Sequence, residues 1–215
     1  MTRMSAAQRR ELLVEAAIRV MTRDGVGRAT TRAIAQEADM PLGVFHYAFR
    51  SKQELMAMVV QTIARRSRAV MDEAVFASET DDVAEIVKAG MLAYFNHVVA
   101  HPHEHLVTYE LTTTALRDAE LESVAKEQYD YYLEDNQQLL EAGADLLQLE
   151  VLEDLPVVTR MLFSLMDGLA LNYLARGGKD TACDVIDLAA VLFSQLARPR
   201  EAPSEDTDLS AQPGG

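Results

Sequence analysis

Hydrophobic residues recur at helical spacing along most of the chain, and no run shows the polar–apolar alternation of a half-buried strand. The first helix is predicted to begin after Ser5, which has capping-box spacing to Gln8, and to end at Gly25. Thr30 can cap a second helix, and Pro41 suits the first turn of a third. The first 50 residues are therefore predicted to form a small three-helix unit.

The third predicted helix has two faces of different chemistry. Phe45 and Phe49 are four residues apart, so both belong on the inner face. The outer face combines a glycine, two hydrogen-bonding rings and a cation, a composition that suits a helix lying in the major groove of DNA. This pattern predicts a helix-turn-helix whose third helix contacts DNA. The outer residues, at i, i+3, i+4 and i+7, are Gly43, His46, Tyr47 and Arg50.

Six further helices are predicted after this unit. The fourth starts at Ser51, where Ser51 and Glu54 repeat the capping-box spacing, and runs to about Ala77. The segment after Pro156 is apolar nearly all round, so that helix is expected to be buried on more than one side. Pro, Ser, Asp, Gly and Gln dominate from Arg198 onwards, which predicts a disordered tail. The last five helices are expected near 83–98, 102–117, 121–147, 157–176 and 181–196.

These patterns predict an all-α fold with two domains and a tail. Residues 1–50 would form an N-terminal helix-turn-helix domain that binds DNA. Residues 51–197 would form a larger C-terminal helical domain for ligand binding and dimerisation, connected to the first by the helix that starts at 51. The remaining residues, 198–215, would be the tail.

Charge is distributed unevenly along the 215 residues, whose formal net charge is −14. Residues 1–70 contain 12 Lys and Arg against 6 Asp and Glu, whereas the rest contains 8 against 28. A basic N-terminal segment on an acidic chain suits a protein that presents one end to a polyanion. The negative total therefore does not argue against DNA binding.

Bulk properties narrow the class of protein further. No apolar run has the length of a membrane-spanning helix, and no secretory signal is evident, so we expect a cytoplasmic protein that does not enter a membrane. The single cysteine, Cys183, excludes an intramolecular disulfide and fits a reducing compartment. Because the chain lacks a glycine-rich phosphate loop, a G-x-S-x-G motif and any other recognisable nucleophile context, we expect neither an enzyme nor a cofactor.

A family signature is matched at Gly43–Leu55, whose sequence is GVFHYAFRSKQEL. It resembles helix three of the tetracycline-repressor (TetR) family, which is close to G-x-[aromatic/Leu]-Y-x-H-F-x-[Ser/Asn]-K-x-x-L, and Thr30–Ala38 is similar to that family's second helix. The resemblance covers roughly residues 5–60. It implies an all-helical homodimeric transcription factor, with a four-helix dimer interface built from the last two helices and a ligand pocket in the C-terminal domain. His46 and Ala48 replace the usual Tyr and His, so the operator sequence cannot be transferred from a relative.

Seven residues are DNA-contact candidates because they match positions of the family signature. Hydrogen bonds to phosphates position a protein on DNA, and contacts to base edges specify the sequence. The alternative for each is an ordinary solvated side chain. The assignment is Thr31, Tyr47 and Lys52 to phosphates, Arg32, Val44 and His46 to base edges, and Gly43 to close approach of the backbone.

Two polar residues, Glu110 and Asn136, interrupt apolar stripes of the C-terminal domain. Buried polar groups need partners, which a ligand, other side chains or water can provide. With nearby aromatic residues they would line an aromatic, slightly acidic cavity suited to a cationic or amphipathic organic molecule. Asp167 is a weaker candidate, for which a plain surface position is the alternative. The ligand-binding candidates are Tyr94, His97, Tyr109, Glu110, Tyr129, Tyr132, Asn136, Phe163 and Met166.

Four of the five histidines gather between His97 and His105. His97 and His101 are four apart on one helix face, a spacing that can hold zinc, although no soft fourth ligand lies nearby. A metal-responsive regulator using this cluster is therefore one alternative, and a polar helix–helix junction without metal is the simpler interpretation. A helical adaptor that binds protein rather than DNA is a further alternative.

The sequence as a whole predicts a ligand-responsive transcriptional regulator, and specifically a repressor. It would bind a palindromic double-stranded DNA operator as a homodimer through its last two helices. A small-molecule effector in the C-terminal domain would tilt the fourth helix, change the spacing of the two recognition helices and release the DNA.

Overall fold

The structure of the protein is a computed structural model that describes residues 4–118 and 121–200. Within those residues it contains nine α-helices, one 3-10 helix and two short strands, so the predicted all-α fold is confirmed. In chain order they are α1 (Ala6–Asp24), η1 (Val26–Arg28), α2 (Thr31–Glu37), α3 (Leu42–Ala48), α4 (Lys52–Phe76), α5 (Val83–Ala100), α6 (Pro102–Ala115), α7 (Glu122–Leu146), β1 (Leu149–Val151), α8 (Leu155–Arg176), α9 (Lys179–Ser194) and β2 (Ala197–Pro199).

Helix α1 is the centre of the N-terminal domain. Its fully buried residues Leu13 and Met21 pack in one core with Ile34 of α2 and Phe45 of α3. The same core continues past residue 50, the predicted domain boundary. Its members from α4 and α6 are Leu55, Met56, Val59, Val60, Ile63, Val107 and Leu111.

Ser5 and Ser51 cap the starts of α1 and α4 as predicted, but only Ser5 forms a complete capping box. Ser5 Oγ accepts a hydrogen bond from Gln8 N at 3.1 Å, and Gln8 Oε1 accepts one from Ser5 N at 2.8 Å. At α4, Ser51 Oγ accepts from Glu54 N at 3.1 Å. Glu54 does not return the bond to Ser51 and instead accepts from Arg50 N at 2.8 Å. The cap of α4 therefore also fixes the end of α3.

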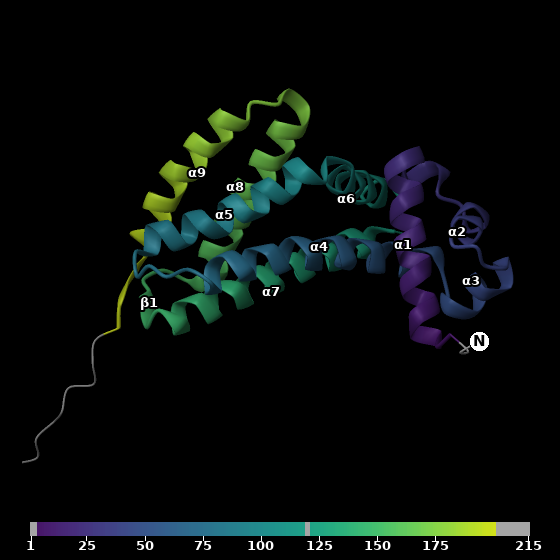
Figure 1. Ribbon diagram of the computed structural model, residues 1–215, viewed down its shortest axis with the longest axis horizontal. Coiled ribbons are helices and arrows are strands. Elements are labelled where there is room, and N and C mark those ends of the chain that lie inside the picture. The colour runs from purple at the N-terminus through teal and green to yellow at the C-terminus, as the bar shows by residue number, and fades with distance from the viewer. Residues whose placement is uncertain (1–3, 119–120, 201–215) are drawn as a thin grey trace, which may run out of the picture.

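The C-terminal domain has a second core, between α5, α8 and α9. Phe95 and Ile186 are fully buried there, with Met91 and Met166 beside them. Figure 1 shows an elongated molecule, with α1–α3 at one end, the α8–α9 hairpin and β1 towards the other, and α4 and α7 running along its length. The two domains thus share α4, which contacts α1, α5, α6 and α7.

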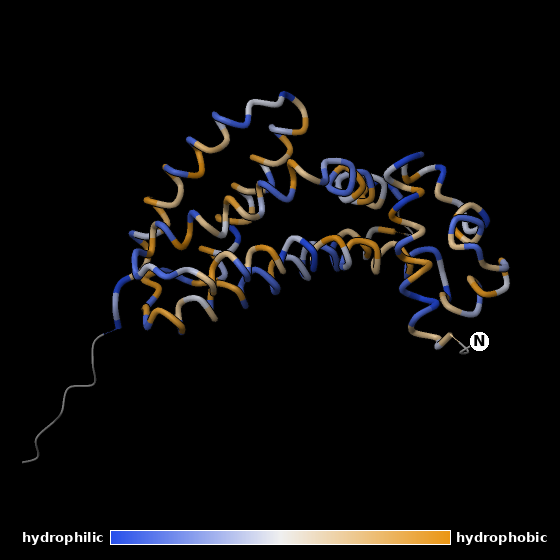
Figure 2. Tube along the Cα trace, viewed as in Figure 1, coloured by the Kyte–Doolittle hydropathy of each residue, from blue (hydrophilic) through white to orange (hydrophobic). Residues whose placement is uncertain are grey.

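The α8–α9 hairpin is less buried than its sequence suggested. In α8 only Val158, Thr159, Met166 and Ala170 are buried, so the prediction that this helix is covered on more than one side is wrong for the single chain. Hydrophobic residues recur along both helices (Figure 2), and many of them lie at the surface. No helix within residues 4–118 and 121–200 combines the length and apolarity needed to cross a membrane.

Two short strands correct the prediction that the chain contains none. Strand β1 pairs antiparallel with β2, and Glu150 lies opposite Arg198, to which it forms an ion pair at 2.8 Å. Arg200 N donates to Gln148 O at 2.8 Å. The predicted disordered tail therefore cannot start at Arg198, because residues 198–200 are paired with the segment after α7. The rest of that predicted tail, 201–215, lies outside the described residues.

Candidate DNA-binding face and ligand cavity

Helix α2 begins with a side-chain cap that holds its first turn at the surface. Thr30 Oγ1 accepts a hydrogen bond from Ala33 N at 3.1 Å. Thr31 is half-buried in that first turn, and Arg32 beside it is exposed. Both candidates therefore lie where the sequence placed them, next to the free N–H groups of a helix start. Their contacts with DNA remain predictions.

Helix α3 separates buried and exposed residues as its pattern predicted, but it ends at Ala48, so Phe49 and Arg50 lie beyond it. Phe45 is buried in the N-terminal core, while Gly43, His46 and Tyr47 are exposed, the last by 80%. Val44 is half-buried and packs against that core, so only part of it is available to a base edge. An aromatic side chain with 80% exposure makes few contacts within its own chain, as expected of a residue that contacts a partner.

The basic side chains of the N-terminal domain fall into a paired set and an unpaired set. Arg10 bonds Glu54 at 2.7 Å, and its guanidinium lies 4.6 Å from the centre of the Phe49 ring. Arg19 and Arg23 share Glu37, each at 2.9 Å. Among the described residues, four others of this domain form no ion pair and no side-chain hydrogen bond, namely Arg28, Arg32, Arg50 and Lys52.

Lys52 occupies the first turn of α4, directly after the cap residue Ser51. The N-terminus of a helix attracts anions through its free N–H groups and the helix dipole. Lys52 adds a full positive charge at the same place, so two features of this helix start favour an anion.

A cavity of about 200 Å³ lies in the C-terminal domain, bounded by α4–α9 and β1. Its wall is mostly aliphatic and aromatic, which favours an organic ligand over an inorganic ion. Six of the nine predicted ligand-binding residues line it. They are Tyr94, Tyr109, Tyr132, Asn136, Phe163 and Met166.

The other three predicted residues, His97, Glu110 and Tyr129, do not line the cavity. Glu110 points towards the N-terminal domain and accepts a hydrogen bond from Val26 N at 3.1 Å. His97 contacts His105, and Tyr129 contacts the Phe163 ring, with centroids 5.8 Å apart. The prediction that these residues line the cavity was therefore wrong, because helical spacing alone did not show which neighbour each side of α5, α6 and α7 would face.

The cavity contains a carboxylate that the sequence interpretation ranked only as a weaker candidate. Asp167, in α8, is half-buried and lines the cavity. Its Oδ1 accepts a hydrogen bond from the Tyr109 hydroxyl at 2.8 Å, and Tyr129 is a second hydrogen-bonding partner. Burial raises the pKa of Asp167, although both phenols oppose that rise. The sequence feature that could have identified Asp167 is its position as an acidic residue in the middle of a nearly continuous apolar helix.

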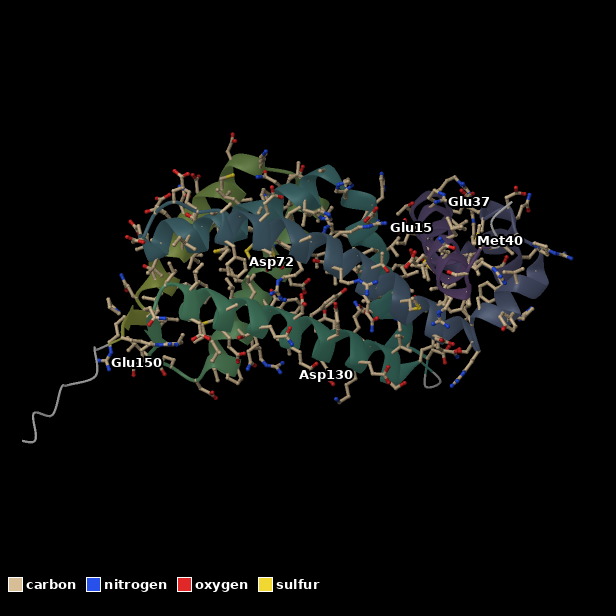
Figure 3. All side chains as sticks on the ribbon, turned by 60° about the horizontal axis from the view of Figure 1, so that its bottom comes forward. Glu15, Glu37, Met40, Asp72, Asp130 and Glu150 are labelled. Carbon is tan, nitrogen blue, oxygen red and sulfur yellow. The ribbon has the colours of Figure 1, made fainter. Side chains whose placement is uncertain are left out.

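The other charged groups of the cavity wall, Arg68 and Asp135, form an ion pair that Arg68 shares with Asp72. Arg68 forms ion pairs with Asp72 at 2.6 Å and with Asp135 at 3.3 Å. Its guanidinium also donates to the backbone carbonyl of Asp135. In Figure 3, Asp72 is labelled in the middle of the molecule, where α4 and α7 run side by side. Arg68 therefore links these two helices beside the cavity.

Two rings of the histidine cluster form a hydrogen-bonded pair. His97 Nδ1 and His105 Nε2 are 3.0 Å apart. Burial lowers the pKa of both rings, that of His105 to about 4, so neither is charged at neutral pH. Within the part of the chain that the structure describes, no group of three or more His, Cys, Asp or Glu is placed to hold a metal ion. The polar-junction interpretation fits this geometry.

Helix α6 connects the cavity to the N-terminal domain. Tyr109 and His105 line the cavity from one side of this helix. From another side, Glu110 bonds η1, and Glu104 bonds Arg66 at 2.9 Å. Arg66 in turn bonds Glu15 of α1 at 2.6 Å; Glu15 is labelled in Figure 3 at the N-terminal end of the molecule. A displacement of α6 would thus act directly on the helix-turn-helix.

Two sequence profiles match the chain. Residues 13–59 match the profile described as bacterial regulatory proteins of the tetR family, and residues 78–199 match the tetracyclin repressor-like C-terminal domain. The first covers α2 and α3 with most of α1, and the second covers the cavity wall from α5 onwards.

Characterised and solved relatives agree with these profiles. The chain is 32% identical to the HTH-type nicotine-responsive transcriptional repressor HdnoR of Paenarthrobacter nicotinovorans, over 80% of this chain and 87% of that protein. It is similar in structure to a transcriptional regulator from Rhodococcus sp. Rha1, with TM-score 0.68, 20% identity, and coverage of 87% and 97% of the two chains. It is also similar to the multidrug binding protein EbrR complexed with imidazole, with TM-score 0.62, 25% identity, and coverage of 83% and 92%.

Proposed function

Because the chain belongs to the TetR family of bacterial regulatory proteins, we propose that it is a homodimeric repressor whose operator DNA is released by a small organic molecule. A member of this family is a DNA-binding transcriptional regulator and not an enzyme. One observation carries the proposal. The same chain has a surface around α3 with cations that form no ion pair among the described residues, and an apolar cavity in its other domain. Its place of action is the cytoplasm, where bacterial DNA lies.

DNA binding is supported by the exposed surface of α2, α3 and the start of α4. Arg32, His46 and Tyr47 are exposed on this surface. Lys52 adds a candidate phosphate contact. Each subunit would place α3 in one major groove of a palindromic operator, with phosphate contacts supplying much of the affinity. Binding should therefore weaken steeply as salt rises.

Dimerisation is supported by the apolar surface of the α8–α9 hairpin. A soluble monomer rarely exposes so many large hydrophobic side chains on two adjacent helices. Packing the hairpin against its copy about a two-fold axis would form a four-helix interface and bury this surface. The exposed residues concerned are Val157, Met161, Leu171, Leu188, Val191 and Leu192.

Coupling between cavity and DNA is supported by the two helices that reach both. Helix α4 lines the cavity through Ser67 and Arg68 and begins at the proposed phosphate site of Lys52. Helix α6 lines it through Tyr109 and bonds the N-terminal domain through Glu110. A ligand that changes the position of either helix would change the spacing of the two α3 helices in the dimer and so disfavour the DNA-bound state.

The nicotine-responsive relative makes nicotine the first effector to test. The experiment is a gel shift of the DNA upstream of the protein's own gene at low salt, with and without effector. Retention of that DNA and its release by effector are expected. If the purified dimer retains no upstream fragment at low salt, repression from a local operator is wrong.

The dimer interface has its own test. Leu188→Glu places a charge on the exposed α9 surface, where Leu188 is 63% exposed in the single chain. The variant should sediment as a monomer and lose operator binding while keeping its helical content. Glu153→Gln, a charge change on the loop before α8, is the matched control and should remain dimeric. A monomeric native protein, or a dimeric Leu188→Glu variant, would contradict the proposed interface.

A further inference from the structure

The cavity wall carries an uncompensated negative charge. Its ionisable acidic and basic side chains are Arg68, Asp135 and Asp167, and its one histidine, His105, is neutral. Arg68 is bound by Asp135 and, just outside the wall, by Asp72. Asp167 forms no ion pair with any described residue, so its charge is balanced only by neutral hydrogen-bond donors.

The carboxylate of Asp167 is held in a fixed direction. Tyr109 of α6 donates its hydroxyl proton to Oδ1 at 2.8 Å, and the same hydroxyl lies 3.0 Å from the Asp167 carbonyl oxygen. Tyr129 of α7 supplies the second hydrogen bond. An ionised carboxylate has about four acceptor positions, so two phenols leave capacity for a ligand donor from the cavity.

Aromatic rings from four helices lie around this carboxylate. Tyr109 and Tyr129 form hydrogen bonds with it, and Tyr94 and Tyr132 line the same cavity. Phe163 packs between two of these rings, with centroids 5.8 Å from Tyr129 and 5.7 Å from Tyr132. Ring faces attract cations and repel anions, and the attraction grows when water is excluded.

The simpler interpretation is that Asp167 only ties α8 to α6 and α7 through the two tyrosines. That role needs hydrogen-bond acceptors but no charge, and an asparagine or a backbone carbonyl would serve it at lower desolvation cost. Burial raises the pKa of Asp167, so the ionised carboxylate is less favourable in this cavity than in water. A cationic ligand would offset the cost of burying the ionised carboxylate, and its attraction to that carboxylate would contribute to its affinity.

We infer that the cavity binds an organic cation, a protonated amine whose N–H donates to the Asp167 carboxylate while its charge lies against the tyrosine rings. The apolar body of the molecule fills the aliphatic part of the cavity towards α5 and α9. The volume of about 200 Å³ is below the roughly 300–1,000 Å³ of pockets for drug-sized ligands, so the amine is compact. This inference rests on the proposed function, to which it adds the chemical class of the effector.

Two probes of nearly equal shape separate charge from size. N-benzylpiperidine is a cation at neutral pH, and N-benzoylpiperidine is the corresponding neutral amide with the same rings. Their binding to the dimer is measured by titration calorimetry at pH 7 in moderate salt. The cation should bind at least about tenfold more tightly, since a charge-assisted hydrogen bond and a desolvated cation–π contact act only on it.

Asp167→Asn is the decisive variant, because asparagine keeps the size of the side chain and an oxygen that can accept from Tyr109. It should lose about tenfold or more of its affinity for N-benzylpiperidine and keep its affinity for N-benzoylpiperidine. Asp130→Asn makes the same substitution on the exposed side of α7, where Asp130 is paired with Lys126, and should bind both probes like the native chain. Circular dichroism checks that both variants keep the native fold.

Three results would overturn the inference: equal binding of both probes, binding of neither, or unchanged cation affinity in Asp167→Asn. DNA release is measured separately, by gel shift with the same probes. Cation binding that depends on Asp167 but leaves the operator bound would uphold the ligand class and refute ligand-controlled repression. Release by the neutral amide alone would uphold ligand control and refute the amine.

Discussion

Among the described residues, the proposed DNA-binding face and the cavity contain charged groups of opposite sign that form no ion pair. On the DNA-binding face they include Arg32, which is exposed, and Lys52, which is half-buried in the first turn of α4. In the C-terminal domain the corresponding group is Asp167, a carboxylate that faces an internal cavity. Under the proposed function, the cations outside would bind a polyanion and the carboxylate inside would bind a cation.

The two domains also differ in how completely their cores are filled. The N-terminal core is filled, with Phe45 only 2% exposed and Leu13 and Ile34 fully buried. The C-terminal domain encloses a cavity, and several of its aromatic residues are half-buried around it. A rigid domain keeps the contact residues of α3 in register, whereas a hollow one can respond to a ligand.

The largest expected effect tests this difference in packing. Phe45→Ala should lower the free energy of unfolding by about 3–5 kcal/mol, because its neighbours cannot close the space it leaves. Phe163→Ala should cost about 1 kcal/mol or less, since its ring already borders a cavity. Urea unfolding followed by circular dichroism measures both. Equal losses would show that the two cores are equally tight.

The second prediction compares an unpaired cation with a paired one. Arg32→Ala should weaken operator binding by about 1–3 kcal/mol and relax the preference at one base position. Arg19→Ala is the matched control, because Arg19 is already bonded to Glu37 at 2.9 Å, and it should change affinity little. Gel shifts on operator variants measure both effects. A larger loss for Arg19 would contradict the assignment of unpaired cations to DNA.

Lys52 should produce a smaller and more uniform effect. Lys52→Ala removes one phosphate contact, so affinity should fall about equally for all DNA sequences. The slope of log affinity against log salt should flatten by about one unit. A loss confined to a single base position would instead place Lys52 at a base edge.

The smallest effect concerns pH and distinguishes two carboxylates. Hydrogen bonds from Arg50 N and Arg10 lower the pKa of Glu54, so its contribution to stability is present above the pKa of the unfolded chain and is lost as pH falls through the folded value. Burial raises the pKa of Asp167, so its ionised form costs stability above that raised value, and the cost disappears as pH falls towards the unfolded value.

Thermal unfolding between pH 7 and pH 4 tests these opposite signs. Glu54→Gln should lower the melting temperature at pH 7 and lose less stability than the native chain on acidification. Asp167→Asn should leave the melting temperature at pH 7 unchanged or slightly raised, since it removes a buried charge without a cationic partner. A clear loss of stability in Asp167→Asn at pH 7 would mean that the charge is structural rather than reserved for a ligand.

Local sequence was sufficient for the helices and for the exposed face of α3. The caps at Ser5, Thr30 and Ser51 fix helix starts by bonds to residues three positions away, so the sequence alone contains both partners. The outer face of α3 follows from helical spacing once Phe45 and Phe49 are assigned to the core. These features depend on short-range geometry, which does not change with the rest of the fold.

Only the tertiary structure decided which polar groups face the cavity. Glu110 and Asp167 were both acidic residues in apolar surroundings, and the sequence interpretation chose Glu110 for the ligand and ranked Asp167 as a weaker candidate. The fold turned Glu110 to Val26 N, 84 positions away, and brought Asp167 to Tyr109, 58 positions away. The strand pair β1–β2 was also missed, because α8 and α9 separate the two strands in the sequence and local patterns do not show that they pair. Helical periodicity specifies a face but not the element packed against it, and packing between distant elements determines which residues surround the cavity.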